Sequence, residues 1–325
     1  MTHSDALCHY LQGFARTDQA WPPPQQACDP SLAWWRALPW EADRVRALEL
    51  LCNAMPQLRL PQQAGISRSD LYRQLVLRGS ETSSPELIPI ERFLQQPLAL
   101  KFQLVQHPYM AMPVLTTSDR HDFLWIVRAL AHRAEPVLIE DGVHAQAVSG
   151  LIHWGLIRSL DLQARSSLIL LHEAPYGSVP AASLPISLDQ QGWIHVSSAL
   201  RLEHELTHLC TKQYLGEMRL NLLDELIADA MGQLVALGGF SAEVFERCLQ
   251  HRWQAYVGEL ESEEAQLALE LVRTRARELE VALSVWRGPA AIRVRSKLLP
   301  WLCRLRLDMK IITPAPTPLA KSDES

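Results

Sequence analysis

The sequence has no long uninterrupted run of apolar residues and no excess of positive charge. Its richest apolar stretch, residues 148–160, is interrupted by His153 and Arg158, so no segment approaches the roughly 18 apolar residues that cross a bilayer. The 325 residues include 31 basic and 36 acidic side chains, which gives a net charge of −5. Proteins that bind nucleic acids are usually basic. We therefore expect neither a transmembrane segment nor a nucleic-acid partner.

The N-terminus also lacks the pattern of an export signal. The first residues, MTHSDALCHYLQGF, contain no basic region followed by an apolar stretch. Cysteine is scarce and no two cysteines form a CxxC pair, which favours reduced thiols over a disulfide framework in a chain of this size. The six cysteines are Cys8, Cys28, Cys52, Cys210, Cys248 and Cys303. These absences predict a cytoplasmic protein.

The composition is that of an ordinary globular protein. Apolar residues make up 48% of the chain, which excludes wholesale disorder, and the length suffices for one large domain or two small ones. Most segments, such as residues 143–160, have helical apolar spacing, so we expect an α+β fold that is predominantly helical. We predict a helical N-terminal subdomain over residues 1–135 that covers or shapes a cleft, and a second domain over residues 136–312. The composition of residues 80–89 predicts a linker, and that of the Pro-rich residues 313–325 predicts a disordered tail.

Two short apolar runs interrupt the helical pattern. Residues 167–172 (SLILLH) and residues 192–196 (GWIHV) predict strands. Ser197 or Ser198 is expected to cap the helix that follows, over residues 198–214, by accepting hydrogen bonds from its free N–H groups. A small β element is therefore expected directly before this helix.

The predicted helix contains the pattern His-Glu-x-x-His at residues 204–208. Residues four apart in a helix project from one face, about one turn apart, so His204 and His208 can bind the same cation. Imidazole nitrogens bind Zn²⁺ at about 2.0–2.1 Å. Glu205 lies about 100° around the helix from His204, where a carboxylate can act as a base on water beside the metal.

A second predicted helix supplies candidates for a third ligand. Catalytic zinc sites usually have three protein ligands and leave the fourth position to water. Glu225 lies 17 residues after His208, which allows a turn through Gly216 and an antiparallel helix that returns to the metal. Asp229 shares a face with Glu225 and can accept a hydrogen bond from the second nitrogen of a ligating histidine. Asp224 is the alternative third ligand.

The two helices resemble the gluzincin branch of the zincin metallopeptidases. The resemblance covers about 30 residues, 198–231, and rests on HExxH followed by a helix with ExxxD. It implies a zincin-like core, with residues 136–312 as the metallopeptidase domain, and one Zn²⁺ per chain. It also implies that the metal ligands are His204, His208 and Glu225, that Glu205 is the general base and that Asp229 orients a ligand.

The function that this resemblance implies is zinc-dependent hydrolysis of a peptide bond by metal-activated water. The Trp-rich N-terminal portion fits a restricted peptide or protein substrate better than general digestion. Two alternatives stay open: a peptidase-like binding or regulatory protein that no longer cleaves, and a zinc amidohydrolase that acts on a non-peptide amide. A partner protein other than the substrate also stays open.

Amide hydrolysis needs a donor that stabilises the developing oxyanion, besides the metal. Among Tyr214, His251, Tyr256 and Arg287 we favour His251, and Tyr256 is also a candidate for substrate binding. His195, on the predicted strand, is a further candidate for substrate binding, and the alternative for each of these residues is a structural role.

The segment of residues 292–312 is basic and amphipathic. We expect it to pack on the domain with its arginines solvated, and the alternative is contact with an anionic surface or a partner.

Overall fold

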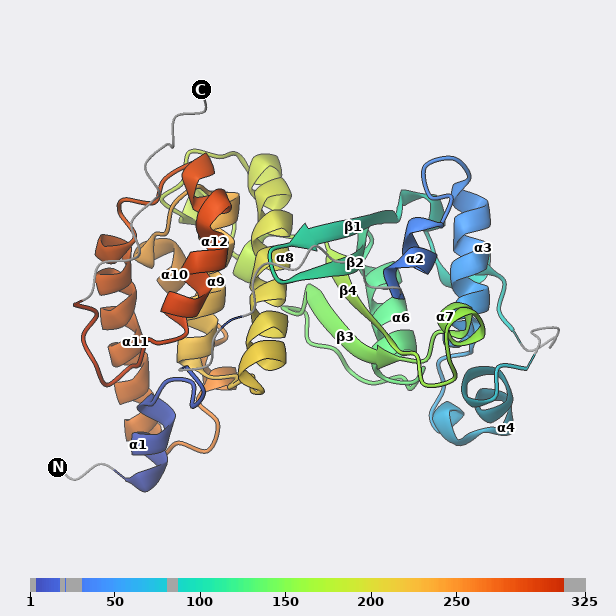
Figure 1. Ribbon diagram of the computed structural model, residues 1–325, viewed down its shortest axis with the longest axis horizontal. Coiled ribbons are helices and arrows are strands. Elements are labelled where there is room, and N and C mark those ends of the chain that lie inside the picture. Colours follow the sequence, from blue (N-terminus) through green and yellow to red (C-terminus); the bar gives the residue numbers. More distant parts are fainter. Residues whose placement is uncertain (1–3, 18–20, 22–30, 81–86, 313–325) are drawn as a thin grey trace. The chain divides into compact units, whose positions relative to one another are not determined.

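The computed structural model describes residues 4–17, 21, 31–80 and 87–312, and the chain divides into two units (Figure 1). The sheet unit is Gln26–Ala174, and the helical unit joins Met1–Gln25 to Pro175–Ser325. The predicted domain boundary after residue 135 lies within the sheet unit. Most of the predicted linker and the whole of the predicted tail lie outside the described residues. The fold is of the mixed α+β class, as the sequence predicts.

The sheet unit is built around four strands in the order β1-β2-β4-β3. Strands β1 and β2 form an antiparallel hairpin, β2 is parallel to β4, and β3 is antiparallel to β4 with an irregularity between Val148 and Leu151. The strands are β1 (Lys101–His107), β2 (Met110–Thr117), β3 (Ala145–Leu151) and β4 (Ser166–His172). The prediction of a strand at residues 167–172 is confirmed, and the hairpin was not predicted.

Helix α6 (Arg120–Ala131) packs against the sheet and closes its core. Phe123 and Val127 from this helix are buried together with Leu115, Leu168 and Leu170 from the strands. The remaining helices and helical turns of the unit are α2 (Ser31–Arg36), α3 (Arg44–Ala54), η1 (Pro56–Arg59), η2 (Ile66–Arg68), α4 (Asp70–Tyr72), η3 (Arg73–Leu77), α5 (Ile90–Phe93), η4 (Pro97–Ala99) and α7 (Trp154–Ser159).

The predicted helix over residues 143–160 is wrong. The segment forms β3, which pairs with β4, and then α7, which His153 caps. Gly150, with a φ of +69°, lies at the irregularity in this pairing. The Nδ1 atom of His153 accepts a hydrogen bond from the N–H of Leu156 at 3.1 Å. The His153 ring is fully buried beside Trp34 and Trp35.

The helical unit contains two long helices that lie antiparallel, α8 (Gln190–Leu215) and α9 (Leu222–Ala236). The other elements of this unit are α1 (Asp5–Leu11), η5 (Tyr176–Ser178), η6 (Ala181–Ser183), α10 (Ala242–Leu249), η7 (Trp253–Tyr256), α11 (Ser262–Ala282) and α12 (Pro289–Leu302). Helix α9 packs against α8, α11 and α12, and every residue from 222 to 234 is buried. It is the central helix of the unit.

Helix α8 begins earlier than predicted, so the predicted strand over residues 192–196 is wrong. The cap is Asp189, whose carboxylate accepts from the N–H of Gly192 at 2.7 Å, and not Ser197 or Ser198. Trp193 and Leu200 are buried at helical spacing on one side of α8. The strands that precede α8 in the chain belong to the sheet unit.

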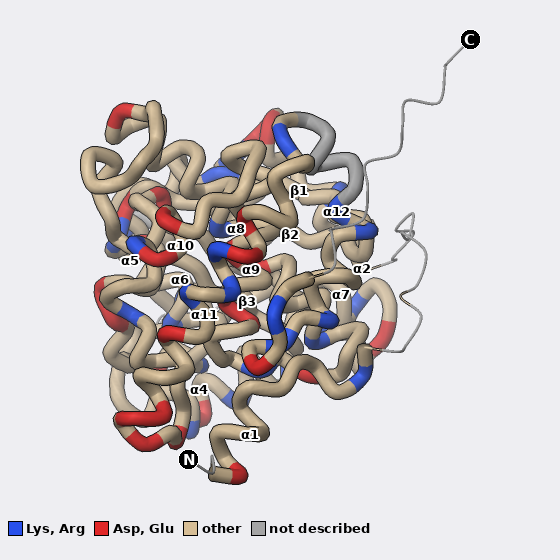
Figure 2. The backbone as a smooth tube through the Cα atoms, turned by 90° about the vertical axis from the view of Figure 1, so that its left-hand side faces the viewer, with Lys and Arg blue, Asp and Glu red and all other residues tan. Residues whose placement is uncertain are grey.

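Charged residues of both signs are spread along the described chain (Figure 2), in keeping with the net charge of −5. None of the helices within the described residues is both long enough and apolar enough to span a membrane.

The buried His153 predicts a pH-dependent stability. Burial lowers the pKa of its ring to about 4, whereas the unfolded chain titrates near 6.5. Between pH 6.5 and 4 the unfolded state binds a proton at His153 that the folded state does not bind. The contribution of the neutral His153 ring to the free energy of unfolding is therefore complete above pH 6.5 and is lost as the pH falls towards 4. Its full size is about 3 kcal/mol.

Urea unfolding between pH 4.5 and 7.5 measures this effect in the whole chain. His153→Asn keeps a capping acceptor but does not titrate, so its free energy of unfolding should fall less steeply with decreasing pH than that of the wild type. Equal slopes for the two proteins would contradict the assignment.

Candidate metal centre

The two histidines of the HExxH motif face one another in the middle of α8. Their Nε2 atoms lie 3.0 Å apart, and both side chains are buried. The carboxylate of Glu225 on α9 completes a triangle, with Oε1 at 3.3 Å from Nε2 of His208 and Oε2 at 3.7 Å from Nε2 of His204. Three potential ligands from two neighbouring helices thus converge on one point.

The dimensions of this triangle fit a small divalent cation. Ligand atoms bound tetrahedrally to Zn²⁺ at about 2.0–2.1 Å lie about 3.3 Å from each other. The Nε2–Nε2 separation of 3.0 Å and the Nε2–carboxylate separations, 3.3 Å to Oε1 and 3.7 Å to Oε2, bracket that value. In addition, Oε2 of Glu225 is buried and has no hydrogen-bond partner among the described residues. The guanidinium of Arg252 lies 3.6 Å from this oxygen, beyond hydrogen-bond distance, so a lone pair of the carboxylate stays open to a cation.

A second carboxylate faces the far side of each imidazole ring. Oδ1 of Asp229 lies 2.7 Å from Nδ1 of His204, and Oδ1 of Asp224 lies 3.4 Å from Nδ1 of His208. A carboxylate accepts hydrogen bonds, so Asp229 favours the tautomer of His204 with the proton on Nδ1 and a lone pair on Nε2. Asp224, the alternative third ligand, therefore lies on the side of His208 away from Glu225.

The charges of the cluster shift its pKa values. Burial alone would raise the pKa of Glu225, but the charges of His204 and Arg252 and the hydrogen bond with His208 outweigh it and lower the pKa to about 2. Burial alone would lower the pKa of His208, but Asp224 and Glu225 outweigh it and raise the pKa well above its usual value. The cluster thus keeps Glu225 ionised and attracts positive charge.

The loop and the packing between α8 and α9 fix this geometry. Helix α8 ends at Gly216, with a φ of +75°, and Asn221 caps α9 by accepting a hydrogen bond from the N–H of Asp224 at 3.0 Å. The helices approach closely at Gly232, where a Cβ atom would lie 2.7 Å from the carbonyl oxygen of Leu200. A glycine inside a helix is unfavourable in itself, and here it allows the close contact.

Two residues that the sequence analysis did not single out, Tyr176 and Arg252, complete the surroundings. Arg252 Nη1 lies 3.6 Å from Oε2 of Glu225, and its Nη2 lies 3.6 Å from Oδ2 of Asp229. The hydroxyl of Tyr176 contacts both Asp229 and His204. Arg252 directly follows the favoured candidate His251, but neither residue belongs to a recognisable motif.

The general-base candidate, Glu205, is half-buried on α8, unlike the fully buried histidines. Arg201 lies one helical turn before it and is buried, and its guanidinium donates to the carbonyl oxygen of Pro175 at 3.1 Å. Glu205 thus lies next to both a proposed metal ligand and a buried cation.

The structure brings Tyr256 to the site but not His251 or His195. The Tyr256 hydroxyl accepts from Nη1 of Arg252 at 3.2 Å, and burial and the charge of Glu225 raise its pKa. His251 is exposed in the turn after α10. His195 is exposed on α8, not on a strand, and nine residues before His204 it projects from the opposite side of the helix.

The other candidates lie elsewhere in the helical unit. Tyr214, near the end of α8, contacts the ring of Trp21, with centroids 5.6 Å apart. Within residues 292–312, Leu298 and Leu302 are fully buried, and Arg295 pairs with Glu203 at 3.0 Å. This segment therefore packs on the unit through its apolar side.

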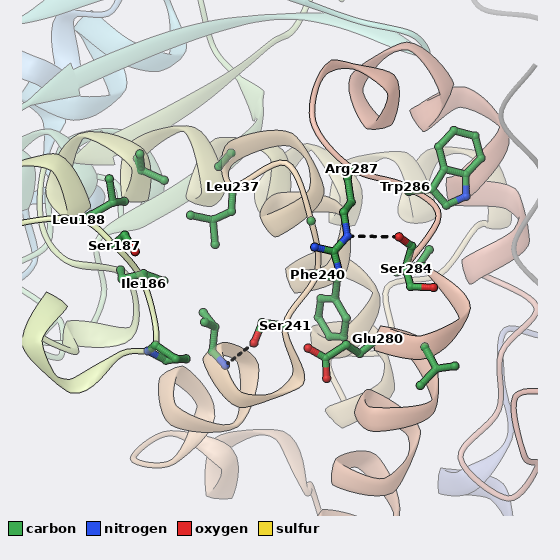
Figure 3. Close-up of a pocket in the computed structure, with 17 residues that line it drawn as sticks. Ile186, Ser187, Leu188, Leu237, Phe240, Ser241, Glu280, Ser284, Trp286 and Arg287 are labelled. Carbon is green, nitrogen blue, oxygen red and sulfur yellow. Dashed lines mark hydrogen bonds between the residues drawn. The ribbon is translucent and has the colours of Figure 1, made fainter.

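Arg287 lines a separate pocket of about 870 Å³ (Figure 3). Its guanidinium donates to the carbonyl oxygen of Ser284 at 3.3 Å, and apolar residues such as Ile186 and Phe240 form the walls. Val196 of α8 also lines this pocket, and nine residues before Glu205 it projects from the opposite side of the helix. The pocket is therefore not part of the candidate metal centre.

Comparison with known proteins shows a family to which this chain belongs. Residues 3–167 and 161–308 match a family of unknown function, DUF7005. The chain belongs to this family. Neither a curated protein nor a solved structure matches it. The matched residues extend over both the sheet unit and the helical unit of this chain.

The triangle predicts one Zn²⁺ per chain of this DUF7005 protein. His204→Ala and His208→Ala should each weaken Zn²⁺ binding by at least about 100-fold, because each removes one of three ligands. His195→Ala is the matched control, since it removes an exposed imidazole from the same helix. Metal analysis and competition with a chelator give the stoichiometry and affinity. Equal Zn²⁺ affinity in His204→Ala and His195→Ala would refute the site.

Proposed function

We propose that this protein is a zinc-dependent hydrolase that cleaves a peptide bond in a restricted peptide or protein substrate. The observation that supports this most is the convergence of His204, His208 and Glu225, with Glu205 next to the first ligand on the same helix. This is the donor set of zinc hydrolases that keep one position open for water.

Zn²⁺ held by these residues would supply Lewis acidity, which lowers the pKa of water and polarises a carbonyl group. His204, His208 and Glu225 would hold the cation, and Asp229 orients the imidazole of His204. Glu205, which remains partly accessible, accepts the proton of the attacking water and transfers it to the leaving nitrogen.

Arg252 and Tyr256 replace His251 in this proposal as donors to the developing oxyanion. Both lie on the Glu225 side of the cluster, and Arg252 stays protonated because Tyr176, Tyr256 and Glu225 raise its pKa, although burial opposes this. A guanidinium held in place before the reaction stabilises negative charge without reorganisation.

The two alternatives differ from this proposal in their need for a catalytic base and in their substrate. A binding protein that no longer cleaves has no need for a base at position 205, so the presence of Glu205 favours an enzyme. An amidohydrolase for a non-peptide amide would use the same residues, and a substrate screen distinguishes it. Two imidazoles and one carboxylate also bind Fe²⁺ in oxygenases, so iron instead of zinc in the purified protein would contradict the hydrolase.

Glu205→Gln tests the proposed base. The variant should bind Zn²⁺ with wild-type affinity but cleave at least about 100-fold more slowly, since general-base catalysis contributes 10²–10⁴-fold. Cleavage of a peptide library, read by mass spectrometry as new termini, measures the rate. Glu259→Gln, which changes an exposed glutamate in a turn, is the control.

Two results would contradict the proposal. Full activity of Glu205→Gln would remove the base assignment. A zinc-loaded wild type that cleaves no peptide and no amide would favour the binding or regulatory protein.

A further inference from the structure

We infer that Tyr176 is a positioning residue of the metal centre: its hydroxyl fixes Asp229 and, through Asp229, the orientation and tautomer of His204. The inference rests on the proposed metal site and deepens it, because it names a residue outside the motif that sets the affinity for the metal. Tyr176 lies 28 residues before His204 in the chain, in the helical turn η5.

Three groups meet at the Tyr176 hydroxyl. Nδ1 of His204 lies 2.9 Å from it, Nη2 of Arg252 lies 3.2 Å from it, and Oδ1 of Asp229 lies within hydrogen-bond distance. Oδ1 of Asp229 also lies 2.7 Å from Nδ1 of His204. All of these side chains except Arg252, which is partly exposed, are buried.

The chemistry of these groups permits one consistent set of hydrogen bonds. Arginine can only donate, so Arg252 donates to the hydroxyl oxygen of Tyr176. An ionised carboxylate can only accept, so Oδ1 of Asp229 receives both the Tyr176 O–H and the His204 Nδ1–H. His204 then carries its proton on Nδ1 and presents the lone pair of Nε2 towards His208 and Glu225.

The position of the Tyr176 ring is itself fixed from several sides. The ring contacts two guanidinium groups, with Cζ of Arg201 at 5.6 Å and Cζ of Arg252 at 5.3 Å from its centroid. The N–H of Tyr176 donates to the hydroxyl of Ser197 on α8 at 2.9 Å. The next residue, Gly177, has a φ of +60° and a Cβ atom there would lie 2.7 Å from the carbonyl oxygen of Cys248.

This arrangement differs from that of an ordinary core tyrosine. Packing of the ring needs no hydroxyl, and a buried hydroxyl is costly unless it is hydrogen-bonded. Here the hydroxyl is bonded to the carboxylate that orients a proposed metal ligand. Substitution of a residue that hydrogen-bonds to a metal ligand typically weakens the affinity for the metal 10–100-fold.

A double-mutant cycle on the Zn²⁺ dissociation constant, measured by chelator competition with the full chain, tests the inference. Tyr176→Phe should weaken binding about tenfold and Asp229→Asn about 10–100-fold. The double variant should bind no more weakly than Asp229→Asn, because the hydroxyl acts through Asp229. Tyr72→Phe, which changes a buried tyrosine of the sheet unit, is the control and should bind like the wild type.

Two outcomes of the cycle would overturn the inference: unchanged affinity in Tyr176→Phe, or losses that multiply in the double variant. Either result, with intact Zn²⁺ binding and activity in the wild type, leaves the proposed function standing. A wild type that binds no Zn²⁺ overturns both.

A second measurement on the wild type keeps the inference testable if Tyr176→Phe does not fold. In metal-free protein labelled with ¹⁵N-histidine, nuclear magnetic resonance should show His204 with its proton on Nδ1, close to the Tyr176 hydroxyl proton. The tautomer with the proton on Nε2 would overturn the inference.

Discussion

The buried carboxylates of α9 are the constraint on which the helical unit depends. Helix α9 is buried over residues 222–234, yet it carries Asp224, Glu225 and Asp229 on its first two turns. An unpaired buried carboxylate costs several kcal/mol, so each one needs a partner. The partners come from every side: His204 and His208 from α8, Arg252 after α10, Tyr176 from η5, and the N–H of Leu220 in the loop, which donates to Asp224 at 3.1 Å.

The balance of charge in this cluster favours a divalent cation. Three carboxylates face the guanidinium of Arg252 and the ring of His208, whose pKa they raise. A cation of charge +2 between the Nε2 atoms and Glu225 would take the place of the His208 proton, and with both imidazoles neutral it would bring the group to neutrality. The same compensation that stabilises the packing of α9 thus creates a site for a metal.

The local part of this site could be predicted from the sequence, since it follows from helical geometry. The spacing of His204 and His208, the cap at Asn221 and the turn at Gly216 are short-range features that determine a pair of antiparallel helices. Glu225 and Asp229 then return to the histidines. Convergence of these residues is what the resemblance to gluzincins led us to expect, whereas metal binding itself remains a proposal.

The rest of the site depends on contacts between segments distant in the sequence. Arg252 lies 27 residues after Glu225, and neither its position nor that of Tyr176 follows from helical periodicity. The prediction of a strand at residues 192–196 was wrong. Trp193, Ile194 and Val196 favour strands by propensity, but the cap at Asp189 and the packing of α8 stabilise a helix there.

Anomalous diffraction at the zinc absorption edge, from crystals grown with one equivalent of Zn²⁺, tests the central claim most directly. The account predicts one anomalous peak about 2.0–2.1 Å from Nε2 of His204, Nε2 of His208 and a carboxylate oxygen of Glu225, with Glu205 not bonded. A peak at any other place, or the three residues in contact with no metal between them, would contradict it.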